Sequence, residues 1–350
     1  MKFDVTQLVR ENIREMKAYS SARDEFNGPA TVFLDANENA FGSPLPENYN
    51  RYPDPHQQEL KKKIASVKGV PEGNIFLGNG SDEAIDLLFR IFCVPGKDNA
   101  IIFPPTYGMY EVAANTNDVS LKKLPLTSQF QIDLEALERA IDENTKLIFI
   151  CSPNNPTGNS IDRELVEIIL NNFNGLVVVD EAYINYSRQR SFIAELTEYP
   201  NLVVLQTFSK AWGMAGLRLG MAFAPGLIID LFNKVKYPYN INQATQRLAL
   251  DALENLTQIN EWTRQTVEQR EGLAGRLNEL PAVSIVFPSD ANFLLVRIEQ
   301  AHELWHYLVH KGIIVRDRSR VTLCENCLRI TVGTSQENES LLQAIQSFYQ

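Results

Sequence analysis

Seven short apolar runs alternate with helical patterns between residues 74 and 224, and this alternation constrains the fold more than any other feature of the sequence. The runs lie at 74–77, 100–103, 119–124, 147–151, 176–179, 202–205 and 219–224. Most are apolar at nearly every position, which is typical of strands buried on both faces of a parallel sheet. Because helical segments separate the runs, the pattern predicts an α/β domain with a mostly parallel seven-stranded sheet between helices.

The pattern changes after about residue 240. The segment 243–280 is typical of one or two long amphipathic helices. Shorter strands are expected at 283–286, 292–298, 313–316 and 328–332, with a helix at 301–310 and a last helix from about Ser335. We therefore predict three parts, which are an N-terminal segment at 1–33 that packs with the small domain, a large α/β domain at 34–240, and a small α+β domain at 241–350.

Charge and composition exclude several classes of partner. The 350 residues carry a formal net charge of −10, which argues against nucleic acid or an anionic membrane as the main partner. No apolar run approaches the roughly 18 residues of a membrane-spanning helix. The N-terminus lacks the apolar core of a secretory signal. These features predict a cytoplasmic protein that acts on small molecules. The run Lys61-Lys62-Lys63 is expected to form a solvated helix face.

The four cysteines do not form a disulfide scaffold. Cys93 and Cys151 lie in or beside apolar runs and are expected to be buried thiols. Cys324 and Cys327 form one isolated C-x-x-C, which would suit a redox pair or half of a zinc site. Because the second half of a zinc site is missing, we expect a turn before the strand at 328–332 instead.

A histidine motif offers a competing function. His302, Glu303 and His306 match the H-E-x-x-H pattern of zinc hydrolases. At about 100° per residue the apolar residues form one stripe of the helix, on the side away from the histidines. The stripe consists of Ala301, Leu304, Trp305 and Leu308. We therefore expect the histidines to face water and predict no metal site.

Polar segments follow directly after four of the predicted strands, where an open α/β sheet binds its ligands. They are G-N-G-S-D-E at 78–83, C-S-P-N-N-P-T-G at 151–158, D-E-A-Y at 180–183 and T-F-S-K at 207–210. Each segment alone is compatible with an ordinary turn or helix cap. Together they supply the groups that pyridoxal 5′-phosphate (PLP) needs. These groups are a lysine for the Schiff base, a carboxylate for the ring nitrogen, donors for the phenolic oxygen and a cradle for the phosphate.

The residues that supply these groups resemble those of the fold-type-I PLP aminotransferases. The shared motifs are N-P-T-G at 155–158, D-E-A-Y at 180–183, S-K at 209–210 and G-L-R-L-G at 216–220, in that order. The likeness runs from about Leu34 to Gly333. Within the family the chain is most similar to the histidinol-phosphate aminotransferases. The supporting stretches are D-A-N-E-N at 35–39, R-Y-P-D at 51–54, P-P-T-Y-G-M-Y at 104–110, 151–158 and L-R-I-T-V-G-T at 328–334.

The resemblance implies catalytic roles for Lys210, Asp180 and Tyr183. Lys210 would carry PLP and later move the proton between the substrate Cα and the cofactor carbon. Asp180 would pair with the pyridinium nitrogen, and Asn155 would join Tyr183 in bonding the phenolic oxygen. Tyr107 would stack on the ring.

The resemblance also implies a phosphate cradle and a dimer. Gly80 and Ser81, together with Ser209 and Arg218, would hold the cofactor phosphate. Tyr52 would reach the cofactor phosphate of the neighbouring subunit, which makes a homodimer the functional unit.

Substrate residues are implied in the same way. Arg329 would bind the glutamate carboxylate in one half-reaction and the substrate phosphate in the other. Arg316 and Tyr19 are expected helpers, and Asn37 and Arg23 are further candidates.

The implied reaction is PLP-dependent transamination between L-histidinol phosphate and 2-oxoglutarate in histidine biosynthesis. Rivals within the family are an aromatic or other amino-acid aminotransferase and a phospho-amino-acid decarboxylase, which would share the cofactor residues. Rivals of a different class are a non-catalytic PLP-binding regulator and a zinc hydrolase that uses His302 and His306.

Overall fold

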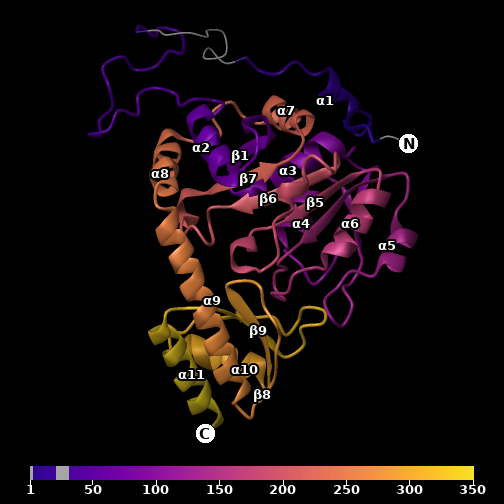
Figure 1. Cartoon of the computed structure of the whole chain (residues 1–350), viewed down its shortest axis with the longest axis vertical. Coiled ribbons are helices and arrows are strands. Elements are labelled where there is room, and N and C mark those ends of the chain that lie inside the picture. The colour runs from indigo at the N-terminus through magenta and orange to yellow at the C-terminus, as the bar shows by residue number, and fades with distance from the viewer. Residues whose placement is uncertain (1–2, 21–30) are drawn as a thin grey trace.

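A computed structural model describes residues 3–20 and 31–350 of the chain. Two sheets form it, and Figure 1 shows them one above the other, joined by the long helix α9. The large sheet has seven strands in the order β1-β7-β6-β5-β4-β2-β3, and the small sheet has four in the order β10-β11-β9-β8. The predicted fold class, an α/β domain with a smaller α+β domain, is confirmed.

The strands of the large sheet are β1 (Ile75–Asn79), β2 (Asn99–Ile102), β3 (Ser120–Lys123), β4 (Thr145–Cys151), β5 (Leu176–Asp180), β6 (Leu202–Thr207) and β7 (Leu219–Phe223). The helices before and between them are α1 (Glu11–Glu15), α2 (Gln58–Lys68), α3 (Ser81–Phe92), α4 (Met109–Thr116), α5 (Leu134–Ala140) and α6 (Arg163–Asn172). The C-terminal helices are α7 (Gly226–Val235), α8 (Gln243–Leu253), α9 (Leu256–Asn278), α10 (Ala301–His310) and α11 (Ser335–Tyr349). The small sheet contains β8 (Val283–Val286), β9 (Phe293–Ile298), β10 (Arg316–Asp317) and β11 (Cys327–Thr331).

Strand direction brings the polar segments to one edge of the large sheet. Strands β3, β2, β4, β5 and β6 are parallel neighbours, whereas β7 runs antiparallel to both β6 and β1. Strand β1 therefore points the same way as β6. The carboxyl ends of β1, β4, β5 and β6 share an edge, and the start of β7 lies at that edge too. This explains why a residue that precedes β7, Arg218, joins residues that follow the other strands.

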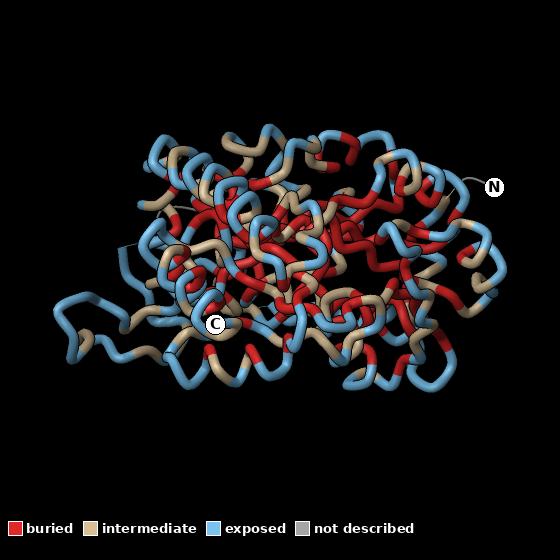
Figure 2. Tube along the Cα trace, turned by 90° about the horizontal axis from the view of Figure 1, so that it is seen from below, coloured by how far each residue is buried: buried red, intermediate tan, exposed pale blue. Residues whose placement is uncertain are grey.

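The core consists of two apolar layers, one on each face of the large sheet. In β4, Ile148 and Ile150 face one layer, while Leu147 and Phe149 face the other, as the two-residue period of a strand requires. Helices α2, α6 and α8 supply the first layer, and α3, α4 and α7 the second. Figure 2 shows the buried residues concentrated inside the body of the molecule.

The small domain confirms most of its predicted elements. Helix α10 spans 301–310, with Leu304 and Leu308 buried and His302 and His306 exposed, as the helical geometry predicted. The strand expected at 313–316 is wrong in position, because β10 is only Arg316–Asp317. Val315 fills the small core instead, where its carbonyl accepts a bond from Trp305 Nε1 at 3.1 Å.

The N-terminal segment does not follow the expectation that it packs with the small domain. Val5, Val9 and Ile13 are buried in the same apolar layer as α3 and α7 of the large domain. The Arg10 N–H donates to the carbonyl of Ile91 at 3.0 Å, which anchors the start of α1 at the end of α3. For residues 5–13 this expectation is therefore not met, because the apolar side chains at 5, 9 and 13 pack against α3 and α7 of the large domain.

Two smaller expectations have opposite outcomes. All four cysteines are free and buried, and Cys324 lies in the turn before β11, as predicted. The solvated face expected at 61–63 is wrong at its first residue, because Lys61 is buried beside Lys236. Burial lowers the pKa of Lys61 to about 8, and the charge of Lys236 contributes. No helix of the described chain is long and apolar enough to cross a membrane.

Candidate active site

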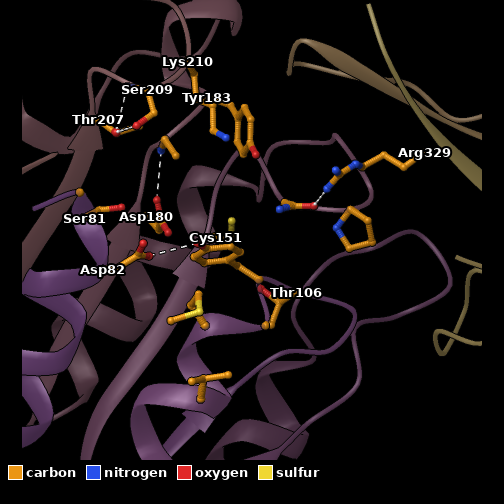
Figure 3. A pocket seen from close by; sticks show the side chains of 18 of the residues that line it. Ser81, Asp82, Thr106, Cys151, Asp180, Tyr183, Thr207, Ser209, Lys210 and Arg329 are labelled. Carbon is orange, nitrogen blue, oxygen red and sulfur yellow. Dashed lines mark hydrogen bonds between the residues drawn. The ribbon is translucent and has the colours of Figure 1, made fainter. Parts of the chain in front are cut away.

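A cavity of about 670 Å³ opens at the shared strand edge, between the large sheet and the small domain. Nine of the predicted cofactor residues line it, namely Gly80, Ser81, Tyr107, Asn155, Asp180, Tyr183, Ser209, Lys210 and Arg218. The predicted substrate residues Arg316 and Arg329 line it as well. Figure 3 shows Lys210 and Tyr183 on one side of the cavity, with Asp180 below them and Arg329 entering from the small domain.

One end of the cavity has the form of an anion cradle. The loop before α3 turns at Gly80, whose φ of +72° is a conformation that favours glycine. A Cβ at this position would lie 2.6 Å from Arg218 Nη2, so the backbone can approach the guanidinium only without a side chain. Arg218 Nη1 also donates to Ser209 Oγ at 3.4 Å. The free N–H groups at the start of α3 and this guanidinium together suit a phosphate.

A buried carboxylate forms the floor of the cavity. Asp180 ends β5, and burial raises its pKa to about 6. The Tyr110 hydroxyl donates to Asp180 Oδ2 at 2.8 Å, and the Ala182 N–H donates to Oδ1 at 3.1 Å. These two hydrogen bonds favour the ionised carboxylate, but they are too weak to cancel the rise in pKa that burial causes. A cation placed against Asp180 would remove the remaining cost.

Lys210 lies open to the cavity, with its amine 5.5 Å from the centre of the Tyr183 ring. Partial burial lowers the pKa of Lys210, and the nearby charge of Arg329 acts in the same direction. A lowered pKa makes a larger share of the amine neutral and nucleophilic at neutral pH. Burial also raises the pKa of the Tyr183 hydroxyl, which therefore stays a proton donor.

Tyr107 and Asp82 form a pair at the cavity wall. The Tyr107 hydroxyl donates to Asp82 Oδ1 at 3.1 Å, and the ring of Tyr107 meets the ring of Tyr110 edge-on at 5.6 Å. Asp82 Oδ2 also accepts from Arg218 Nη2 at 3.4 Å. The aromatic ring is therefore held in one orientation at the mouth of the cradle.

The far end of the cavity is cationic. Arg329 on β11 donates to Asn155 Oδ1 at 2.6 Å, while its buried Nε has no hydrogen-bond partner among the described residues. Arg316 lies opposite Arg329 in the β10–β11 pair. Arg318, two residues after Arg316, lines the same end of the cavity.

The sequence prediction missed three residues of the site. Asp82 on α3 and Arg318 at the end of β10 line the cavity, whereas Tyr110 on α4 is buried behind it and bonds Asp180. Asp82 and Tyr110 lie in stretches that the sequence singled out, at 78–83 and 104–110, but were given no role there. Arg318 lies beyond the strand expected at 313–316, so only the spacing of two from Arg316 could have indicated it.

Some predicted residues do not reach this cavity in the single chain. Tyr52 stacks on Tyr239 with ring centres 4.4 Å apart and lines a second cavity together with Asn37. Tyr19 is 74% exposed and lines neither of these two cavities. Arg23 lies outside the described residues.

The histidines of α10 lie on the surface. His302 Nδ1 is 2.8 Å from Asp317 Oδ2, and His302 Nε2 is 3.3 Å from His306 Nε2. Within residues 3–20 and 31–350, no group of three or more histidine, cysteine or acidic side chains could hold a metal ion. The zinc-hydrolase alternative therefore has no support in the described part of the chain.

The residues of the cavity fit PLP by their chemistry. The cradle at Gly80 has room for a phosphate but none for a Cβ. The buried carboxylate of Asp180 would be stabilised by a cation such as a protonated ring nitrogen. The amine of Lys210 lines the same cavity. No other described cavity combines a lysine, a buried aspartate and a glycine-formed anion cradle.

Known proteins resemble the chain along nearly its whole length. The histidinol-phosphate aminotransferase of Parabacteroides distasonis is 54% identical over 344 residues, which cover 98% of this chain and 99% of that protein. That of Cytophaga hutchinsonii is 51% identical over 348 residues, with 99% and 100% covered.

Solved structures agree in fold. The histidinol-phosphate aminotransferase from Clostridium acetobutylicum superposes with a TM-score of 0.78 at 25% identity, covering 86% of this chain and 91% of that one. The histidinol-phosphate aminotransferase from Sinorhizobium meliloti, solved in complex with pyridoxal-5′-phosphate, has a TM-score of 0.77 at 24% identity, with 89% and 90% covered. The family model of aminotransferase class I and II matches residues 28–345, and the chain belongs to this family.

Proposed function

We propose that this protein is a PLP-dependent aminotransferase that exchanges an amino group between L-histidinol phosphate and 2-oxoglutarate, in histidine biosynthesis. The observation that carries the proposal is the single cavity in which Lys210 and Asp180 lie between an anion cradle and a cluster of arginines. Relatives named histidinol-phosphate aminotransferase at 51–54% identity over the whole chain support the choice of substrate.

Bound PLP supplies an electron sink that stabilises negative charge at the substrate Cα. Lys210 would hold it through the side-chain amine. Asp180 would pair with the ring nitrogen, where a positive charge offsets the cost of the buried carboxylate. Tyr183 and Asn155 would donate to the phenolic oxygen, and Tyr107 would cover one face of the ring. Gly80, Ser81, Ser209 and Arg218 would bind the phosphate.

The protein residues would also move the reacting proton. Once displaced by the amino substrate, the amine of Lys210 would be free to take the proton from the substrate Cα and to return it two bonds away, at the cofactor carbon. Its lowered pKa suits this task, because a neutral amine is the form that accepts a proton. Arg329 and Arg316 would bind the anionic end of either substrate, which is a carboxylate in glutamate and a phosphate in histidinol phosphate.

The functional unit we propose is a cytoplasmic homodimer. The segment 31–56 extends away from the body of the molecule in Figure 1 and exposes large apolar side chains. Leu34 is 86% exposed and Phe41 is 102% exposed. Tyr52 lies on the same segment, outside its own chain's main cavity. In a dimer with two-fold symmetry, Tyr52 and Asn37 would be supplied to the partner's cavity, with Tyr19 beside them.

The first experiment is the visible spectrum of the purified protein, before and after histidinol phosphate is added without an oxo acid. The proposal expects an absorption band of the lysine-bound cofactor that converts to the amino form of the cofactor. Lys210→Ala should abolish both band and conversion. If only other amino donors convert the band, the cofactor stands and the substrate is wrong. A protein that PLP cannot colour contradicts the whole proposal.

A further inference from the structure

The β10–β11 pair places three arginines on one face. Arg316 lies opposite Arg329 in the ladder, and the Arg318 N–H continues the ladder by donating to the carbonyl of Cys327 at 2.8 Å. Side chains alternate along a strand, so Arg316 and Arg318 share a face with Arg329. All three line the main cavity.

None of these three side chains forms a hydrogen bond or ion pair with a carboxylate in the described part of the chain, although the charge of Asp317 acts on Arg318 from a distance. The Arg329 guanidinium donates to the neutral amide of Asn155 and lies 5.3 Å from the centre of the Phe293 ring. Neither Arg316 nor Arg318 has a side-chain hydrogen bond or ion pair within residues 3–20 and 31–350. Asp317 lies between them but faces away, toward His302 and the Ser319 N–H, both at 2.8 Å.

The arginines are close enough to repel one another. The pKa of Arg318 is lowered, first by burial and then by the charges of Arg329 and Arg316. Burial and the charge of Arg316 also lower the pKa of Arg329, against the opposite effect of Tyr183. Arg318 and Arg329 are half-buried and Arg316 is exposed beside them. Holding these three positive charges together is costly, and an anionic ligand of high charge would offset that cost.

The number of arginines distinguishes the two anions that the proposed reaction must bind. One planar guanidinium can bind a carboxylate through both of its oxygens, and Arg329 with Arg316 suffices for that. A phosphate monoester carries close to two negative charges and three free oxygens at neutral pH. The phosphate can therefore accept hydrogen bonds from a third guanidinium, whereas a carboxylate has no free oxygen left for that third group.

We infer that Arg318 is a specificity-determining residue, which binds the phosphate of the amino substrate and favours this dianion over the side-chain carboxylate of glutamate. The inference rests on the proposed function, which it deepens by assigning phosphate recognition to a residue of β10's end. If the inference is correct, Arg318 contributes to the half-reaction with histidinol phosphate and not to the half-reaction with glutamate.

The test compares Arg318→Gln with the unaltered holoenzyme in both half-reactions. For histidinol phosphate, KM should rise roughly tenfold to a hundredfold, as expected for the loss of one charge-assisted bond. The KM for glutamate and the visible spectrum should not change. Arg318→Lys keeps the charge without the planar fork and should recover part of the loss. Arg320→Gln is the matched control, because Arg320 is exposed on the same loop and does not line the cavity.

Inorganic phosphate provides a second measurement that does not depend on the amino substrate. Its inhibition constant should rise in Arg318→Gln, whereas inhibition by acetate should not change. Equal rises of both KM values would indicate a merely structural role and would overturn the inference, as would an unchanged KM for histidinol phosphate. If the unaltered enzyme does not use histidinol phosphate, the proposed function is wrong. The inhibition series with phosphate, run with whichever donor is used, then decides on Arg318 separately.

Discussion

Asp180 is a buried carboxyl whose environment raises the cost of its negative charge. It is fully enclosed, and the two hydrogen bonds that it accepts leave its pKa raised to about 6. A carboxyl with a raised pKa binds more protons in the folded chain than in the unfolded chain between about pH 4 and pH 6. Its ionisation therefore destabilises the cofactor-free protein progressively as the pH rises through this interval.

Asp180→Asn should stabilise the cofactor-free protein at pH 8 while abolishing transamination. The asparagine keeps the shape and an acceptor oxygen but has no charge to bury. A gain on the order of 1–3 kcal/mol in the free energy of unfolding is expected above pH 6, and little or none below pH 4. Urea unfolding at pH 4 and pH 8 measures it. A gain that is the same at both pH values would show that the buried charge is not its cause.

Tyr110→Phe gives the control at the same site. It removes the hydroxyl that donates to Asp180, so the ionised carboxylate loses a bond that favours it. The stability at pH 8 should therefore fall by about 1–3 kcal/mol, opposite in direction to Asp180→Asn. Stability that does not depend on this hydroxyl at pH 8 would contradict the assignment of the bond.

At the scale of single residues, the sequence predicted polar residues that follow the strands of the large sheet. It missed two residues on helices, Asp82 and Tyr110, and Arg318 at the end of β10. Asp180 and Lys210 are recognisable only in combination, because each alone is compatible with a turn or helix cap, whereas the polar segments together supply every group that PLP needs. Tyr110 lies on α4 beside Ala113 and Ala114, all three buried, so its pattern is that of an ordinary packed aromatic. Only the three-dimensional contact with Asp180 distinguishes it.

Helix α11 shows how a single element is held in place at its start. The Thr334 side chain accepts from the Glu337 N–H at 3.3 Å, and Glu337 Oε2 accepts from the Thr334 N–H at 2.7 Å. This reciprocal pair is a capping box. It fixes the helix that supplies Leu341, Leu342 and Ile345 to the core of the small domain.

Thr334→Ala should destabilise the protein by about 1 kcal/mol, because the Glu337 N–H loses its acceptor and the hydroxyl bond to Glu337 Oε2 is lost as well. The midpoint of urea unfolding measures the loss. Ser340→Ala is the matched control, since Ser340 is exposed within the same helix and its hydroxyl bonds only the Gln336 carbonyl at 2.9 Å. If the two variants lose the same stability, the cap has no special role.

Element boundaries were predictable where a local signal marks them. The start of α11 follows from its cap, and α10 from its apolar stripe. The strand expected at 313–316 was wrong because the apolar residues there do not set the ladder. Pairing with β11 does so, and it begins only at Arg316. Ile314 is instead 73% exposed. Sequence periodicity carries no information on which strand will pair with which.

Helix α9 contributes to the apolar cores of both the large and the small domain. Ile259 near the start of α9 lies in the apolar cluster of the large domain, while Leu273 and Leu277 lie in that of the small domain. The domain boundary at 240/241 remains a prediction, since the change of pattern in the sequence marks the start of the helices and not the change of core. The active-site cavity lies where both domains contribute residues, so its arginines depend on how the small domain is placed.

The exposed segment 31–56 carries the last prediction. The single chain leaves Leu34 and Phe41 in water, and apolar exposure of this extent on a projecting loop indicates a protein–protein contact. In a two-fold dimer each such contact occurs twice. The unaltered protein should therefore sediment as a dimer at micromolar concentration. In Phe41→Asp, burial of a charge should weaken the dimer by at least about 2 kcal/mol and release monomer.

The same substitution should lower the affinity for PLP, although Phe41 is remote from its own chain's cavity. The reason is that Tyr52, on the same segment, is proposed to complete the partner's phosphate site, which a monomer lacks. Ile168→Asp is the control, because Ile168 is a comparably placed surface residue, 45% exposed on α6, away from the segment in Figure 1. Sedimentation and PLP titration of both variants separate the outcomes. A monomeric Phe41→Asp protein that binds PLP as tightly as the dimer would contradict the role of Tyr52, and an unaltered protein that is monomeric would contradict the homodimer itself.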